Sequence, residues 1–125
     1  MQIINKFTMF TTVVSDMPKA KEFYSDKLGL KVVTDYRQDD DHWWVSLSLP
    51  EGEFTITLTT FHENIKKGNV SIYFTTSDIT KAHKDLSDKG VKVGEIQDDL
   101  YGPGSGVKFI KFEDPDGNWV HVAQA

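Results

Sequence analysis

Apolar and polar residues alternate with a period of two in several short segments, and this alternation is typical of half-buried β-strands. The alternation predicts strands over residues 7–14, 31–36, 42–49, 54–60, 70–75, 91–96, 107–112 and 119–123. Two further segments place their apolar residues at helical spacing instead. These residues are Ala20, Phe23, Tyr24 and Leu28 in the first segment, and Ile79, Ala82 and Leu86 in the second. The pattern therefore predicts two helices, each lying between two strands.

The two predicted helices belong to an internal repeat. Seven positions match at an offset of 62 residues, and three more matches follow at an offset of 61. Asp16 and Asp78 are natural N-caps, since a carboxylate accepts hydrogen bonds from the free N–H groups of a first turn. Gly29 and Gly90 follow the last turn, where a left-handed residue ends a helix at little cost. The alternative is that two unrelated amphipathic helices look alike, but matching caps and stops favour a repeat.

Each half of the chain therefore has the predicted order β-α-β-β-β. We expect module one over about residues 5–62 and module two over about residues 69–125, within one domain that spans residues 1–125. A short polar link, residues 63–69, joins the two halves. The fold class expected from this order is α+β.

Three short motifs carry a resemblance to a known family. They are Val14-Ser15-Asp16-Met17, then Phe23-Tyr24 with Leu28-Gly29-Leu30, and finally Phe112-Glu113-Asp114-Pro115-Asp116-Gly117-Asn118. In this order, on two tandem modules, they resemble the vicinal oxygen chelate superfamily, also called the glyoxalase/bleomycin resistance/dioxygenase superfamily. The resemblance implies that the strands of both modules curve into an open, cup-like mixed sheet. It also implies a binding or active site inside the cup, and a homodimer.

The resemblance further implies four inward positions that hold a divalent metal in the family's enzymes. The matching positions of this sequence are Met9, Ser71 and His121, with Thr57 as the fourth, or Ile56 if the register slips by one residue. Only His121 is a good metal ligand, and one imidazole does not hold a catalytic divalent ion. We therefore expect no metal and no cofactor. His42, His62 and Glu63 have no spacing that would join them to His121 in another metal site.

Strand alternation predicts what the cup contains instead. The expected ligand pocket is lined by Met9, Thr11, Trp44, Thr57, Ser71, Tyr73, Trp119 and His121, with Tyr101 from a loop above it. Trp43 is expected on the opposite face, in the packing against a helix or a second copy of the chain. Hydroxyl groups and aromatic rings suit a flat, amphipathic small molecule. The alternative is that Trp119 and Tyr73 fill the cup as core and leave no pocket.

The compositions of two loops suggest two functions, a lid over the cup and a calcium-binding loop. Residues 98–106 contain three glycines and a proline, and this segment is predicted to be a mobile loop. It is either a lid that carries Tyr101 or a plain surface connection. Asp39, Asp40 and Asp41 lack the spacing and the glycine of a calcium-binding EF-hand loop. They are interpreted as a solvated hairpin tip.

Composition narrows the class of protein. The chain has 14 Lys and Arg against 19 Asp and Glu, a net charge of −5, and no cysteine. The absence of cysteine excludes disulfides and a thiol nucleophile, and it favours the cytoplasm. No basic stripe suggests a nucleic-acid partner, and no long apolar run suggests a signal peptide or a membrane span.

The first hypothesis for function is a metal-free protein that binds a small amphipathic or aromatic molecule, for resistance or sequestration. The alternative is a lyase, isomerase or dioxygenase of the same superfamily. Such an enzyme would use a divergent metal site or acid–base chemistry through His121, which is the one catalytic candidate. A third possibility is a structural or regulatory partner of another protein.

Overall fold

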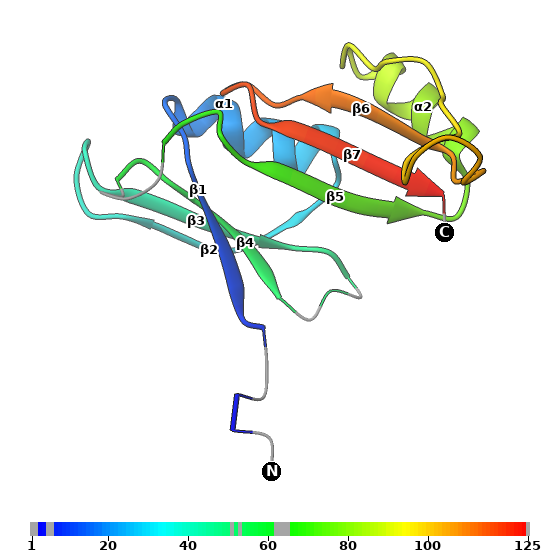
Figure 1. Ribbon diagram of the computed structural model, residues 1–125. Helices are drawn as coiled ribbons and strands as arrows, with labels where there is room; N and C mark the ends of the chain where they lie inside the picture. Colours follow the sequence, from blue (N-terminus) through cyan, green and yellow to red (C-terminus); the bar gives the residue numbers. More distant parts are fainter. Residues whose placement is uncertain (1–2, 5–6, 51, 53, 62–65, 125) are drawn as a thin grey trace. The chain divides into compact units, whose positions relative to one another are not determined.

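The protein is described here by a computed structural model that covers residues 3–4, 7–50, 52, 54–61 and 66–124 (Figure 1). The chain divides into two compact units, Met1–Lys67 and Gly68–Ala125. Each unit contains one small sheet and one helical segment. No helix of the described residues is both long enough and apolar enough to cross a membrane.

The first unit is a four-stranded mixed sheet with a helix packed on one face. Its elements are β1 (Met9–Val13), α1 (Met17–Glu22), η1 (Phe23–Lys27), β2 (Lys31–Arg37), β3 (Trp43–Ser48) and β4 (Thr55–Thr59). The strand order is β1-β4-β3-β2, in which β1 and β4 are parallel and the other pairs are antiparallel. Helix α1 packs against β4, the central strand beside β1. Apolar residues of β3 and β4 are buried and form the core of this unit.

The second unit repeats this plan with three strands. Its elements are β5 (Ser71–Thr76), α2 (Ile79–Asp88), β6 (Phe109–Glu113) and β7 (Trp119–Gln124). The strand order is β5-β7-β6, in which β5 and β7 are parallel and β7 and β6 are antiparallel. Helix α2 packs against β6 and β7. The predicted α+β class with mixed sheets is therefore confirmed.

The helix signals predicted from the repeat are confirmed in both units. The Asp16 carboxylate accepts a hydrogen bond from the Lys19 N–H at 3.1 Å. The Asp78 carboxylate accepts one from the Lys81 N–H at 3.0 Å. Gly29 and Gly90 adopt φ angles of 82° and 85°, a left-handed conformation that favours glycine after a last helical turn.

The last turns of the first helix are wound more widely than predicted, although Gly29 still follows them. After α1 the chain widens into the π-helical segment η1, where the Leu28 N–H bonds the Phe23 carbonyl at 3.1 Å. Phe23 and Tyr24 lie at the start of this segment, and both side chains are buried, with their rings edge to face at 5.3 Å. The apolar pattern predicted the buried face correctly but carried no signal for the wider turn.

One predicted strand is wrong. Residues 91–96 form no strand. The Gly94 N–H bonds the Lys111 carbonyl of β6 at 3.1 Å, and the next residue after the segment, Gln97, forms an isolated bridge with Phe109. The Val93 N–H bonds the carbonyl of Val91, two residues earlier, which bends the backbone out of a ladder. Gly94 weakens the segment further, because glycine is a poor strand residue.

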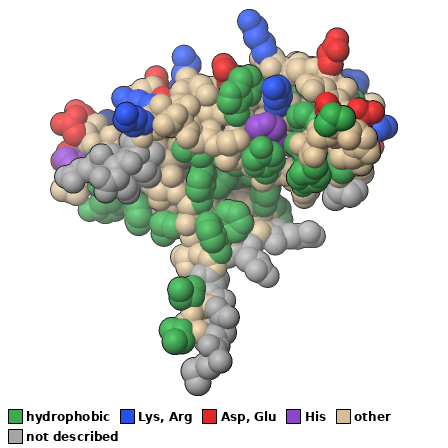
Figure 2. Space-filling model, viewed as in Figure 1, with side chains coloured by type: hydrophobic (Ala, Val, Ile, Leu, Met, Phe, Trp, Pro, Cys, Tyr) green, Lys and Arg blue, Asp and Glu red, His purple; other side chains and the backbone are tan. Residues whose placement is uncertain are grey.

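Asp39, Asp40 and Asp41 lie at the tip of the β2–β3 hairpin, as interpreted from the sequence. Figure 2 shows acidic side chains and a histidine together at the left of the view, where Figure 1 places this tip. The Asp39 carboxylate bonds the His42 ring at 2.8 Å, and the interaction lowers the pKa of Asp39. Arg37 pairs with Asp40 at 2.8 Å. These contacts satisfy the charged groups locally in a solvated turn.

Candidate functional site

One face of the second sheet carries the predicted pocket residues of β5 and β7. Alternation along β5, β7 and β6 places on this face Ser71, Tyr73, Thr75, Trp119, His121, Ala123, Phe109, Lys111 and Glu113. The opposite face carries buried apolar residues such as Ile72, Val120 and Ile110. Tyr73 and Lys111 both lie beside His121, on its two neighbouring strands.

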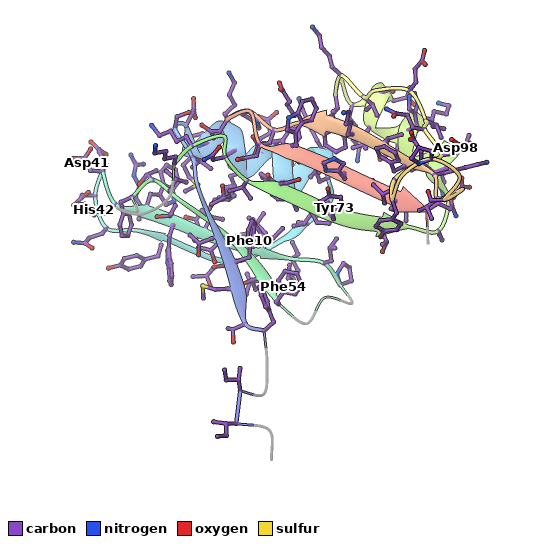
Figure 3. The ribbon with its side chains drawn as sticks, viewed as in Figure 1. Phe10, Asp41, His42, Phe54, Tyr73 and Asp98 are labelled. Atoms are coloured by element: carbon purple, nitrogen blue, oxygen red, sulfur yellow. The ribbon has the colours of Figure 1, made fainter. Side chains whose placement is uncertain are left out.

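Aromatic rings stack across this face. The Tyr73 ring lies parallel to the His121 imidazole, with centroids 4.3 Å apart and planes 10° apart. The Phe109 ring lies 6.2 Å from the same imidazole. Figure 3 shows Tyr73 projecting from β5. Tyr73 is 61% exposed and Trp119 is 43% exposed, so both rings offer accessible area to a ligand.

The imidazole of His121 is in an unusual electrostatic environment. Its Nδ1 atom is buried and has no hydrogen-bond partner among the described residues. Burial lowers the pKa of His121, the charge of Lys111 lowers this pKa further, and a hydrogen bond with the backbone of Ile72 raises it. His121 is therefore neutral at pH 7 and retains a ring nitrogen lone pair.

The depressed pKa of His121 predicts acid sensitivity of the fold. The unfolded chain binds a proton at this histidine more readily than the folded chain, so acid favours unfolding. We expect the free energy of unfolding to fall as the pH drops from 7.5 through about 6.5 to 5. His121→Gln should show a shallower loss over the same interval. Urea denaturation of both proteins at pH 7.5 and pH 5 measures the difference.

His83→Gln is the matched control for this experiment, because His83 lies on α2, away from the stack. It should keep the wild-type dependence on pH. The pKa values of Asp35 and Asp39 are lowered from their ordinary value of 3.8, so these carboxylates stay ionised between pH 5 and pH 7.5 and do not contribute to the difference. Equal pH slopes for wild type and His121→Gln would contradict a depressed pKa at His121.

On the first sheet, polar side chains of one face bond to one another. The Thr57 hydroxyl accepts a hydrogen bond from Ser46 at 3.0 Å and donates one to the Met9 sulfur at 3.5 Å. Thr57 and Ser46 are buried, and Thr11 lies opposite Thr57 in the β1–β4 register. Trp44 lies on the same face as Ser46, and its indole Nε1 is buried without a partner among the described residues.

The pairing registers locate the four positions implied by the family resemblance. Thr11 pairs with Thr57 in the first unit, and Tyr73 pairs with His121 in the second. Because Thr11 and Tyr73 correspond in the repeat, the counterpart of His121 is Thr57 and not Ile56.

These four positions do not fit a divalent metal. Two of them, Met9 and Thr57, bond to each other, and Ser71 offers only a neutral hydroxyl. No group of three or more His, Cys, Asp or Glu side chains able to hold a metal lies in the part of the chain that the structure describes. A divalent cation needs several imidazole or carboxylate ligands, and His121 alone supplies one.

The remaining predicted residues lie elsewhere. Trp43 is on the opposite face from Trp44 and donates a hydrogen bond to the Asp35 carboxylate at 2.7 Å, while Arg37 lies 4.5 Å above its ring. Tyr101 is exposed in the loop before β6. That loop is closed by a hydrogen bond from the Leu100 N–H to the Val107 carbonyl.

The described histidines outside the sheet faces form no metal site with His121. His42 is bonded to Asp39 at the hairpin tip and contacts the Phe61 ring. His62 and Glu63 lie outside the described residues.

The predicted pocket residues thus form two groups, one in each unit. Ser71, Tyr73, Trp119 and His121 share the face of the second sheet, and Met9, Thr11, Trp44 and Thr57 share that of the first. The sequence interpretation missed Lys111, whose ammonium lies 5.1 Å from the centre of the Trp119 ring. Alternation of Phe109 and Lys111 along the strand predicted over residues 107–112 was the signal that would have found it.

Comparison with known proteins finds a matching family model and similar proteins. A family model described as Glyoxalase/Bleomycin resistance protein/Dioxygenase superfamily matches residues 6–122. The uncharacterized protein YwkD of Bacillus subtilis (strain 168) is 32% identical over 112 residues, which cover 83% of this chain and 84% of that protein.

Solved structures of similar fold agree with the family match. TnmS3, an antibiotic binding protein from Streptomyces sp. CB03234, superposes with a TM-score of 0.86 at 22% identity, covering 99% of this chain and 98% of that one. A member of the Glyoxalase/bleomycin resistance protein/dioxygenase superfamily from Sphaerobacter thermophilus DSM 20745 superposes with a TM-score of 0.82 at 27% identity. That superposition covers 99% of this chain and 100% of the other.

Proposed function

This chain belongs to the Glyoxalase/Bleomycin resistance protein/Dioxygenase superfamily, and from that premise we propose that it binds a small amphipathic or aromatic molecule without a divalent metal. The observation that carries the proposal is the accessible stack of Tyr73 on His121, with Trp119 exposed on the same sheet face. The antibiotic-binding role of TnmS3 supports a small-molecule ligand. Resistance or sequestration is the corresponding physiological role.

Physical chemistry supports a ligand on this face. Exposed aromatic rings that share one face of a sheet are apolar surface that a flat ligand would cover favourably. Stacking on Tyr73 or Trp119 supplies contact area, and the neutral His121 supplies a hydrogen-bonding group at its edge. The proposal extends to a cytoplasmic homodimer, which the absence of cysteine and the family resemblance favour.

Removing one aromatic ring from this face should weaken ligand binding. In Tyr73→Ser the stacking surface over His121 is lost, and we expect the dissociation constant of a planar aromatic ligand to rise about tenfold. The measurement is a titration of the protein with a panel of planar aromatic compounds, followed by tryptophan fluorescence. The metal content of protein purified without chelator is measured on the same sample.

Phe54→Ser is the control, because Phe54 is a similarly exposed ring that contacts Phe7 at one end of the first sheet. Phe54→Ser should leave the dissociation constant within about twofold of the wild-type value, since Phe54 is not part of the proposed ligand-binding face. Equal weakening by both substitutions, or no binding by any compound of the panel, would argue against the proposed site. One divalent ion per purified chain would overturn its metal-free character.

A second candidate function is acid–base catalysis through His121. The observation that favours it is the buried Nδ1 without a described partner, on an imidazole that is neutral at pH 7. Turnover that His121→Gln abolishes, in protein free of metal, would favour this enzyme over a binding protein.

A further inference from the structure

Charge is distributed unevenly on the face of the second sheet. Among the described residues on this face, Lys111 and Glu113 are the two with permanent charges at pH 7. Lys111 lies opposite His121 in the register, and Glu113 lies one row away, opposite Trp119. A ligand on the Tyr73–His121 stack therefore lies next to the backbone of Lys111. The Lys111 ammonium reaches the Trp119 ring, in the row of Glu113, and forms no ion pair with that carboxylate.

The ammonium of Lys111 is held against the face rather than neutralised. It lies 5.1 Å from the centre of the Trp119 ring, in a cation–π contact. It forms no ion pair with a carboxylate of the described residues. A side chain held in this way loses less conformational entropy when it pairs with a ligand.

His121 does not compete with Lys111 for an anion. Lys111 itself contributes to keeping the imidazole uncharged, by repulsion between like charges. Lys111 is consequently the one positive charge on this face of the described structure at pH 7. An acidic group on a ligand would lie beside this lysine while the ligand's ring stacks on an aromatic side chain.

We propose that the β5-β7-β6 face selects planar aromatic anions, such as aromatic carboxylates, through Lys111. The aromatic part of the ligand lies on Tyr73 or Trp119, and its carboxylate pairs with the Lys111 ammonium. Lys111 thereby determines specificity between acids and their neutral analogues. This inference rests on the proposed small-molecule binding and adds the chemical class of the ligand.

A matched pair of probes tests the selection. Naphthalene-2-carboxylate and the neutral naphthalene-2-carboxamide have nearly the same shape, so a difference in affinity reports the charge. We expect the wild-type protein to bind the carboxylate about five- to tenfold more tightly in isothermal titration calorimetry at low salt. Lys111→Gln should reduce the carboxylate affinity to that of the carboxamide and leave the carboxamide unchanged. Lys111→Arg should keep the preference.

Lys108→Gln is the matched control, because it removes the same charge from an exposed residue just before β6, at a position of the opposite alternation. It should leave the preference for the carboxylate intact. Added salt should weaken the carboxylate and not the carboxamide, since mobile ions screen an exposed charge pair.

The outcomes separate this inference from the proposed function. If both probes bind equally, or if Lys108→Gln and Lys111→Gln have the same effect, selection by Lys111 is wrong and small-molecule binding stands. If neither probe binds and the aromatic panel also fails, both proposals are wrong. If the panel binds and its acids bind no better than their amides, the selection alone is overturned.

Discussion

Asn118→Ala should lower the free energy of unfolding by about 2–4 kcal/mol, because it breaks a buried polar network. The Asn118 side chain accepts a hydrogen bond from the Val70 N–H at 3.0 Å and donates one to the Asp114 carboxylate at 2.8 Å. Asn118 is fully buried and Asp114 nearly so. Truncation leaves the Val70 N–H without its acceptor and removes one donor from a buried carboxylate. Urea denaturation measures the loss.

Two further variants show which contact matters. Asn118→Asp keeps the acceptor for Val70 but places a second carboxylate against Asp114, so it should destabilise the fold at least as much as alanine. Thr75→Ala, at an exposed position of β5, is the control and should cost under about 0.5 kcal/mol. A loss below about 1 kcal/mol for Asn118→Ala would mean that water satisfies these groups.

This network explains why the Asp-Pro-Asp-Gly-Asn motif matters to the site. Val70 precedes β5 and Asn118 precedes β7. The Val70 N–H donates to the Asn118 side chain and the Val70 carbonyl accepts from the Trp119 N–H, so both hydrogen bonds lie at the start of the parallel pair. The same register places Tyr73 beside His121. The motif thus sets the alignment of the aromatic stack, although none of its side chains belongs to the stack.

Local signals predicted the framework of the fold well. Asp16, Asp78, Gly29 and Gly90 marked the helix ends through their own backbone chemistry, which acts within one turn. The repeat and the motifs led to the superfamily, which the family match confirms. Residues 91–96 show the limit, since alternation alone does not reveal whether a segment finds a partner along its length.

The site was predicted less completely, because alternation assigns a side chain to a face but not to a neighbour. Tyr73 and His121 were expected on one face, yet their parallel stacking depends on the register between two strands that are distant in sequence. The cation–π contact of Lys111 depends on β6 in addition. Such contacts follow from tertiary pairing, which a single sequence does not show.

The two sheets also differ in what they leave open to a ligand. In the first unit, Thr57 uses its hydroxyl on Ser46 and Met9, so the position equivalent to His121 is already satisfied. In the second unit, the His121 Nδ1 has no described partner and the Tyr73 ring is exposed. The Trp44 Nε1 on the first face also lacks a described partner, so the two faces differ mainly in the exposed rings of Tyr73 and Trp119, and this difference favours the second as the ligand-binding face.

Leu58→Ala should destabilise the first unit by about 2–5 kcal/mol, since it creates a cavity in the centre of the β1-β4-β3-β2 sheet. Leu58 is 0% exposed and lies on β4, beside Thr12 of β1 and Val45 of β3. Helix α1 packs against this strand, so little collapse around the cavity is expected. The same change at Leu49, which is 40% exposed, is the control and should cost under about 1 kcal/mol.

The Leu58 variant also tests how the first polar face is held in place. Thr57 and Thr59 alternate with Leu58, and a slip of one residue would exchange the two faces of β4. Burial of Leu58 on the helix side therefore keeps the Thr57 hydroxyl beside Ser46 and Met9. Amide hydrogen exchange should increase along β4 in Leu58→Ala and stay unchanged in Leu49→Ala. Unchanged exchange in both variants would show that the Thr57 hydrogen bonds, and not the apolar core, fix the register.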